Sequence, residues 1–163
     1  MTERDYGGSE LVVQDEHGVW TVLRETIAAH PEEVFSALTT EAGLTRWFPV
    51  AARIDLREGG SIVLGWDRKF RRTLTIGITA FDPGGTVAWA WPARSGDCTI
   101  PIEWTVKPSV EEGAEVILRM GPIAPEPESL IAMAEDGESW RWYLCNLRTV
   151  LESRNDMRTV RPL

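Results

Sequence analysis

The sequence holds few side chains of the kinds that carry out acid–base, nucleophilic or metal chemistry. Its histidines are His17 and His30, and its cysteines are Cys98 and Cys145. None of them belongs to a spaced cluster of metal ligands, and the chain has no phosphate loop and no Gly-x-Ser-x-Gly nucleophile motif. We therefore expect no metal and no cofactor, and no residue is assigned a catalytic role. His30 directly precedes a proline and is interpreted as a helix cap.

Glu25 is the carboxylate for which the sequence suggests a chemical role. It shares the alternation of Leu23 and Ile27, which would turn it toward an apolar interior. A desolvated carboxylate has a raised pKa and can act as a general base. The alternative is that Glu25 turns to solvent or pairs with an arginine, so the sequence does not decide between an enzyme and a binding protein.

Tryptophan is the most unusual feature of the composition, with eight residues against two tyrosines and four phenylalanines. Several of these indoles share alternate positions with other apolar residues in strand-like runs, which places them on the apolar side of a sheet. Indole rings offer large flat faces and one N–H donor, which suits aromatic ligands. The same rings can also interlock and fill a core without leaving a cavity, and both interpretations stay open.

The elements that position these side chains follow from the apolar periodicity. Residues 19–27 predict a first strand, Pro31 begins a helix, and a second short helix ends at Pro49. The period then changes to two, with short turns between the runs, which predicts an antiparallel meander. The six predicted strands are residues 52–57, 61–66, 72–81, 86–91, 98–106 and 114–120.

The last predicted element is a long amphipathic helix over residues 138–153, whose apolar stripe needs a sheet to pack on. Trp142 and Cys145 fall off this stripe, and we expect them to meet the acidic segment or a second subunit, so a homodimer is one open arrangement. The stretch from Gly121 to Gly137 is rich in proline and acidic residues. It is interpreted as a lid over the interior or as a poorly ordered loop.

Length and charge limit the classes of protein. The chain has 163 residues, which suits one domain, and a net charge of −8, of which residues 111–138 supply −7 through eight acids and one arginine. A basic cluster at residues 68–72 is interpreted as a solvated hairpin tip, so no nucleic-acid partner is expected. The sequence shows no signal peptide, no apolar run long enough to span a membrane and no disulfide framework, which predicts a cytoplasmic protein with free thiols.

This order of elements resembles the helix-grip fold of the START-like (SRPBCC) superfamily, an α+β fold. The motifs that carry the resemblance are the run from Thr26 to Thr39, Gly43-Leu44, Trp47-Phe48 and the closing pattern Trp140-x3-Leu144-x2-Leu147-x3-Leu151-Glu152. They look like the signatures of the bacterial relatives of the Hsp90 ATPase activator. The resemblance covers roughly residues 18–154, and it leaves residues 1–17 and 155–163 as terminal tails.

The resemblance implies a curved antiparallel sheet that grips the long helix, with two short helices after the first strand and an apolar cavity between sheet and helix. The residues expected to bind a small hydrophobic, aromatic ligand there are Trp47, Phe48, Trp66, Trp89, Trp91, Trp104, Met120, Trp140 and Leu144. The resemblance also implies two alternatives. One is a cyclase, dehydratase or hydrolase of the same fold, and the other is an Hsp90-activator-like interaction module that docks through the acidic residues 111–138.

Overall fold

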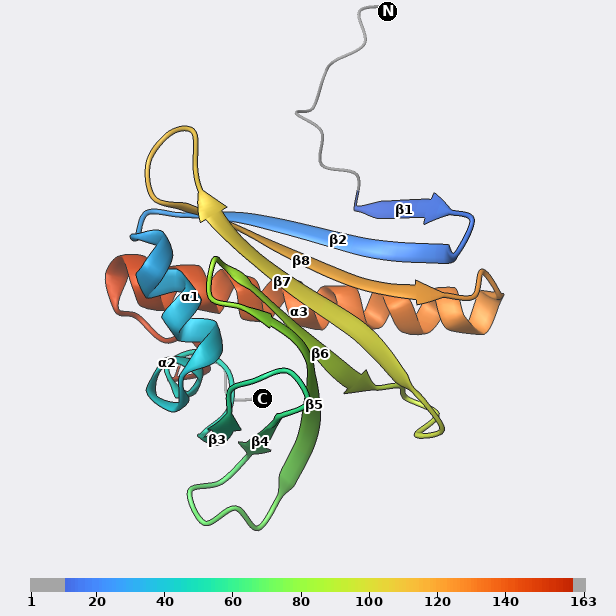
Figure 1. The fold of residues 1–163 in the computed structure, drawn as a ribbon, viewed down its shortest axis with the longest axis horizontal. Coiled ribbons are helices and arrows are strands. Elements are labelled where there is room, and N and C mark those ends of the chain that lie inside the picture. The colour runs from blue at the N-terminus through green and yellow to red at the C-terminus, as the bar shows by residue number, and fades with distance from the viewer. Residues whose placement is uncertain (1–10, 160–163) are drawn as a thin grey trace, which may run out of the picture.

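A computed structural model describes residues 11–159 and contains a single eight-stranded sheet with three α-helices (Figure 1). The strands are β1 (Val12–Asp15), β2 (Gly18–Ile27), β3 (Ala51–Asp55), β4 (Ser61–Gly65), β5 (Thr73–Asp82), β6 (Thr86–Pro92), β7 (Thr99–Pro108) and β8 (Ala114–Ile123). The helices are α1 (Pro31–Thr39), α2 (Glu41–Thr45) and α3 (Pro127–Ser153), followed by a short 3-10 helix, η1 (Met157–Thr159). Among these residues, no helix combines the length and the hydropathy that crossing a membrane needs.

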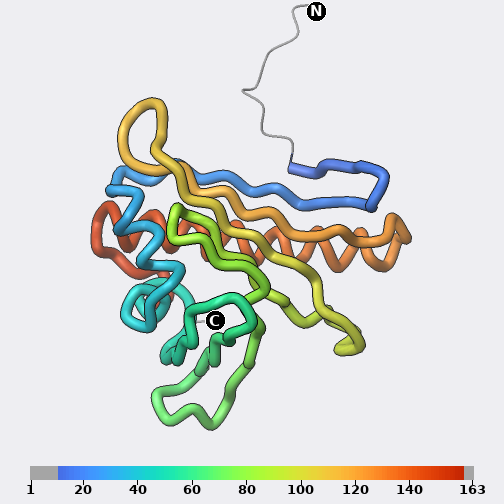
Figure 2. Tube along the Cα trace, viewed as in Figure 1, coloured from blue at the N-terminus to red at the C-terminus, as the bar shows by residue number. Residues whose placement is uncertain are grey.

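The sheet has the order β1-β2-β8-β7-β6-β5-β4-β3, and every neighbouring pair is antiparallel. The predicted meander is therefore confirmed for the six strands from β3 to β8. The pairing of β2 with β8 brings the beginning of the fold beside its end, and Figure 2 shows the sheet curving around the long helix. The α+β helix-grip architecture, with two short helices between β2 and β3, is confirmed.

One strand lies where the sequence predicts only a tail. Residues 12–15 form the edge strand β1, because Asp15 organises a tight turn into β2. The carboxylate of Asp15 accepts the backbone N–H of His17 at 2.8 Å and the indole N–H of Trp20 at 2.9 Å. Residues 1–10 and 160–163 of the two predicted tails lie outside the described residues.

The interpretation of residues 121–137 as a lid or a disordered loop is wrong. Strand β8 runs on to Ile123, and α3 begins at Pro127 rather than at Glu138, which gives a helix of 27 residues. Proline suits this first helical position because an N–H group there has no partner within the helix, so its absence costs no hydrogen bond. Gly137 lies within the helix, where a glycine costs only about 1 kcal/mol relative to alanine, so the surrounding helix carries it.

The apolar stripe of α3 packs on the concave face of the sheet. Trp140, Leu144, Leu147 and Val150 of the helix are buried. Opposite them, each strand contributes the alternate residues that the period of two predicts, among them Ile62, Trp89, Trp104 and Leu118, all with no exposed surface. Burial of these side chains is the main source of stability of the fold.

The end of α3 is tied to the α2–β3 connection by a polar network. The buried Asn146 donates its Nδ2 to the backbone carbonyl of Trp47 at 2.8 Å, and its Oδ1 accepts the backbone N–H of Met157 at 2.7 Å. Each nitrogen of the Arg158 guanidinium also donates, either to the carboxylate of Asp156 or to the backbone carbonyls of residues 45, 46, 48 and 49. Residues 156–158 are therefore part of the folded domain, and they hold in place the segment that carries Trp47 and Phe48.

Replacement of Asn146 tests this network. We expect Asn146→Ala to lower the free energy of unfolding by about 2 kcal/mol, because it leaves the buried carbonyl of Trp47 and the partly buried N–H of Met157 without partners. The measurement is chemical unfolding followed by tryptophan fluorescence. Asn155→Ala is the control, since Asn155 is exposed. Equal stabilities of the two variants would contradict the structural role of Asn146.

The network also predicts a pH dependence. Desolvation is the largest influence on Asp156 and raises its pKa, but the hydrogen bonds from Arg158 and Asn146 outweigh it, so the pKa is lowered from 3.8. The stability that this carboxylate contributes is complete above the unfolded-state pKa and is lost as the pH falls through the lower folded-state pKa. We therefore expect the difference in stability between the wild type and Asp156→Asn to shrink between about pH 5 and pH 2. A constant difference over this range would contradict the lowered pKa.

Candidate functional site

The middle of the space between α3 and the sheet is filled by aromatic rings. The ring centroid of Trp104 lies 5.9 Å from that of Trp47 and 5.3 Å from that of Trp89. Trp140 of α3 contacts Trp104 edge-on at 5.5 Å. The indole N–H groups of Trp89 and Trp104 have no hydrogen-bond partner among the described residues. Where these four indoles meet, between α3 and the sheet, the rings interlock and leave no open cavity among them.

The nine predicted ligand-binding residues therefore lie in three different places. Trp47, Trp89, Trp104 and Leu144 have no exposed surface, and none of them lines a cavity described below. Phe48, Trp66, Trp91 and Trp140 lie along a small cavity of about 220 Å³ beside Tyr143. Met120 lies apart from both groups, in a larger cleft.

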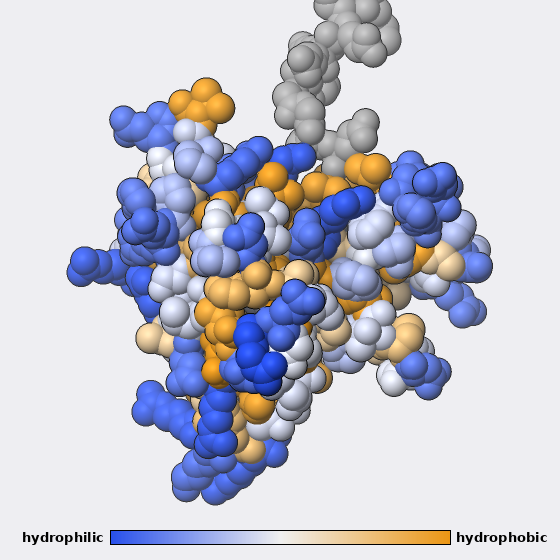
Figure 3. Space-filling view, viewed as in Figure 1, coloured by the Kyte–Doolittle hydropathy of each residue, from blue (hydrophilic) through white to orange (hydrophobic). Residues whose placement is uncertain are grey.

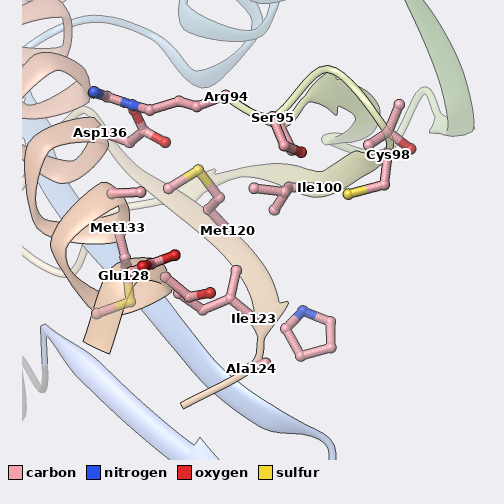
Figure 4. Close-up of a pocket in the computed structure, with 15 residues that line it drawn as sticks. Arg94, Ser95, Cys98, Ile100, Met120, Ile123, Ala124, Glu128, Met133 and Asp136 are labelled. Carbon is pink, nitrogen blue, oxygen red and sulfur yellow. The ribbon is translucent and has the colours of Figure 1, made fainter. Parts of the chain in front are cut away.

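This larger cleft, of about 530 Å³, lies between the first half of α3, the end of β8 and the hairpin that joins β6 to β7 (Figure 4). Its walls are mainly apolar. Ile100 and Met120 come from β7 and β8, Ile123 from the end of β8, and Met133 from α3. Figure 4 shows the thioether of Met120 between the helix and the strands, Met133 on the helix, and Cys98 on the far side of the cleft. The free thiol of Cys98 is exposed.

Charged side chains close one end of the cleft. Arg94, on the β6–β7 hairpin, donates to the carboxylates of Glu135 and Asp136 on α3, with a distance of 2.9 Å between its Nη2 and Asp136 Oδ1. The hydrogen bond from Arg94 to Asp136 is the main reason why the pKa of this guanidinium is raised. Asp136 also lines the small aromatic cavity, so the two cavities adjoin. An apolar pocket with a few polar anchors is suited to holding a small hydrophobic molecule.

Glu25 faces α3, as its alternation predicts, but it meets arginines there. Its two carboxylate oxygens lie 3.1 Å from Arg141 Nη1 and 2.9 Å from Arg148 Nη1, and its side chain is 12% exposed. Pairing with arginine is thus the alternative that holds, and Glu25 lines none of the cavities described here. His30 caps α1 as expected, since its Nδ1 accepts the backbone N–H of Glu32 at 3.4 Å.

The acidic residues 111–138 do not form one surface. They begin in the β7–β8 loop, continue along β8 and end on α3. Strand β8 has ten residues, so its two ends lie about 30 Å apart. Glu115 is paired with Lys107 at 3.0 Å and Arg24 at 3.3 Å, whereas Glu135 and Asp136 are paired with Arg94. The segment therefore offers several separate acidic groups instead of a continuous docking face.

Sequence reasoning missed most of the cleft because it began the last helix at residue 138, whereas α3 begins at Pro127. Arg94, Ile123, Met133 and Asp136 were not among the predicted site residues. A signal was present, since Leu130 and Met133 continue the apolar spacing of Trp140 toward the N-terminus, and Pro127 stands at a suitable first position. The pairing of Arg94 with α3 joins residues about forty positions apart, which no local pattern reveals.

Comparison with known proteins agrees with this architecture. Residues 28–152 match the family model described as "Activator of Hsp90 ATPase homolog 1-like protein". No curated protein matches the chain.

Solved structures share the fold at low sequence identity. Protein SSP2350 from Staphylococcus saprophyticus has a TM-score of 0.72 at 19% identity, over 85% of this chain and 96% of its own. The Aha1 dimer from Colwellia psychrerythraea has a TM-score of 0.66 at 21% identity, over 82% and 96%. CalU16 from Micromonospora echinospora has a TM-score of 0.68 at 20% identity, over 92% and 86%. These likenesses establish the fold and not a ligand.

The role of Arg94 in holding the first half of α3 is testable. Ion pairs between half-exposed side chains stabilise a structure only modestly, so we expect Arg94→Gln to speed hydrogen exchange of the amides of residues 130–137 by about two- to fivefold. Exchange over residues 144–151, which the core holds, serves as the internal reference. Arg57→Gln breaks an ion pair with Asp55 at the other edge of the sheet and is the matched control. Unchanged exchange in Arg94→Gln would show that this pair does not anchor the helix.

Proposed function

The chain belongs to the family of Activator of Hsp90 ATPase homolog 1-like proteins, and within this family we propose that it binds a small hydrophobic molecule in the cleft between α3 and the sheet. The observation that carries the proposal is the cleft of about 530 Å³, which falls within the range of small-molecule sites. Its walls combine aliphatic and thioether side chains with a charged pair at one end. This combination favours a largely apolar ligand with few polar groups.

The methionines support an aromatic ligand in particular. Met120 and Met133 reach the cleft from opposite sides, β8 and α3. Thioether sulfur makes favourable contacts with aromatic rings, and the flexible side chain adapts to their shape. Burial of about 250 Å² of apolar ligand surface contributes about 6 kcal/mol before the ordering costs, which allows micromolar to millimolar affinity.

The family match also supports an Hsp90-activator-like interaction module as a second candidate. Its suggested docking surface, the acidic residues 111–138, is divided between the two ends of β8. An enzyme of the same fold is the third candidate, and its charged groups would be Arg94 and Asp136, which line the cleft as an ion pair. We place ligand binding first because the described residues form an apolar cleft, whereas they do not form a continuous acidic docking surface.

Two further expectations stay as proposals. We place the protein in the cytoplasm because both cysteines are free thiols. A homodimer is proposed because Trp142 and Cys145 keep part of their surface exposed on α3.

Binding in the cleft is tested with a substitution that fills the cleft. The neutral fluorophore N-phenyl-1-naphthylamine is titrated into the protein, and its emission rises on entering an apolar site. Ala132 lines the cleft, so we expect Ala132→Trp to occupy the space and weaken binding by at least about tenfold. Ala134 lies two positions away on the same helix and is exposed, so Ala134→Trp makes the same substitution without filling the cleft.

Both variants are first checked for folding by thermal unfolding. Binding retained in Ala134→Trp and lost in Ala132→Trp supports the proposal. Equal binding by both folded variants, or no binding by the wild type, contradicts it and favours the interaction module.

A further inference from the structure

A third cavity, of about 630 Å³, lies toward the C-terminal end of α3. It shares no lining residue with the cleft, but it shares Phe48, Trp66 and Tyr143 with the small aromatic cavity. It is bounded by the β4–β5 hairpin, the segment after α2 and the η1 region. Its character is different, because two arginines of the hairpin, Arg68 and Arg72, stand over an aromatic wall of Phe48, Trp66 and Tyr143. In Figure 3, hydrophilic side chains gather over this hairpin at the bottom of the view.

The two hairpin arginines keep their charges available. Both are exposed, and within residues 11–159 neither forms an ion pair. Asp67, the carboxylate on the same turn, accepts the backbone N–H groups of Lys69 at 2.8 Å and Arg72 at 3.0 Å. The hydrogen bond from the Arg72 backbone is the largest of the influences that lower the pKa of Asp67, and the charge of Arg72 adds to it. Asp67 therefore shapes the turn and aims its oxygens at the backbone.

The third arginine at this cavity, Arg158, is not available to a ligand. Its guanidinium is fully engaged with Asp156 and with four backbone carbonyls, and Asp156 Oδ2 lies 2.7 Å from its Nη2. Its charge is balanced and its donors are used. The groups that can receive an anion here are thus Arg68 and Arg72.

The aromatic wall supplies an apolar face and a neutral donor. Phe48 packs edge-on against Trp66 at 5.7 Å and against Tyr143 at 4.7 Å, which fixes all three rings. The hydroxyl of Tyr143 makes no hydrogen bond to residues that the structure describes. Burial raises the pKa of this phenol, so it stays protonated at neutral pH and can donate to a ligand oxygen.

From these features we infer that this cavity is a separate binding site for an aromatic anion, a flat apolar molecule that carries a carboxylate or phosphate. The ring system lies against Trp66 and Tyr143, and the anionic oxygens meet the guanidinium groups of Arg68 and Arg72, whose planar forks match such oxygens. A net charge of −8 repels anions over the molecule as a whole. A preference for an anion must therefore come from local groups such as these.

The test uses 2-naphthoate and its neutral isostere 2-naphthamide, with binding measured by calorimetry and by shifts of the tryptophan N–H signals. We expect the wild type to bind the carboxylate about tenfold more tightly than the amide. Arg68→Gln/Arg72→Gln should remove this preference and leave amide binding unchanged. Lys69→Gln/Arg71→Gln changes the same charge on the same turn, at residues that do not line the cavity, and should keep the preference.

The outcomes separate this site from the cleft. If Ala132→Trp still binds naphthoate, the naphthoate site lies outside the cleft. This result does not depend on whether N-phenyl-1-naphthylamine binds in the cleft. A third probe, 2-naphthyl phosphate, is titrated in the same way. Its affinity relative to 2-naphthoate shows whether the site favours a phosphate or a carboxylate, and a preference for either anion supports the inference. The inference is overturned if naphthoate and naphthamide bind equally, if neither binds, or if both double variants lose the preference to the same extent.

Discussion

The contact of Trp140 on α3 with Trp104 in the sheet is the interaction on which the rest of the structure depends. These rings, with Trp47 and Trp89, fix the helix against the concave face at centroid distances of 5.3–5.9 Å. Side chains at this density leave no room between them, so the rings themselves fill the centre of the domain. The two larger cavities beside α3 differ in chemistry because different hairpins border them.

The two halves of α3 are held by different kinds of interaction. The second half is buried and tied down by Asn146, and its arginines bind Glu25. The first half relies on Arg94 and on partly exposed apolar contacts. The cleft therefore adjoins the half of the helix that is less deeply buried. The two halves differ because the buried residues of α3 run from Trp140 to Val150.

Much of the fold was predictable from the sequence, because each strand alternates clearly and the motifs of the family stand in order along the chain. The ligand site was less predictable, since an apolar face does not reveal whether opposing side chains interlock. Trp89 and Trp104 share the parity expected of pocket residues, yet their rings meet other rings. The start of α3 was missed because a proline, acidic residues and Gly137 resemble a loop. Arg158, which anchors the C-terminal segment, donates to backbone carbonyls about 110 positions away, and no local pattern shows this.

The most direct measurement of where a hydrophobic ligand binds is an NMR titration of the methionine methyl groups with N-phenyl-1-naphthylamine. Met120 and Met133 lie in the cleft, whereas Met157 lies in η1 and serves as a reference within the same molecule. We expect the signals of Met120 and Met133 to shift together and saturate, while Met157 and the indole N–H groups of Trp89 and Trp104 stay in place. Shifts confined to those indoles, with unmoved Met120 and Met133, would show that the aromatic core opens to the ligand and that the cleft is not its site.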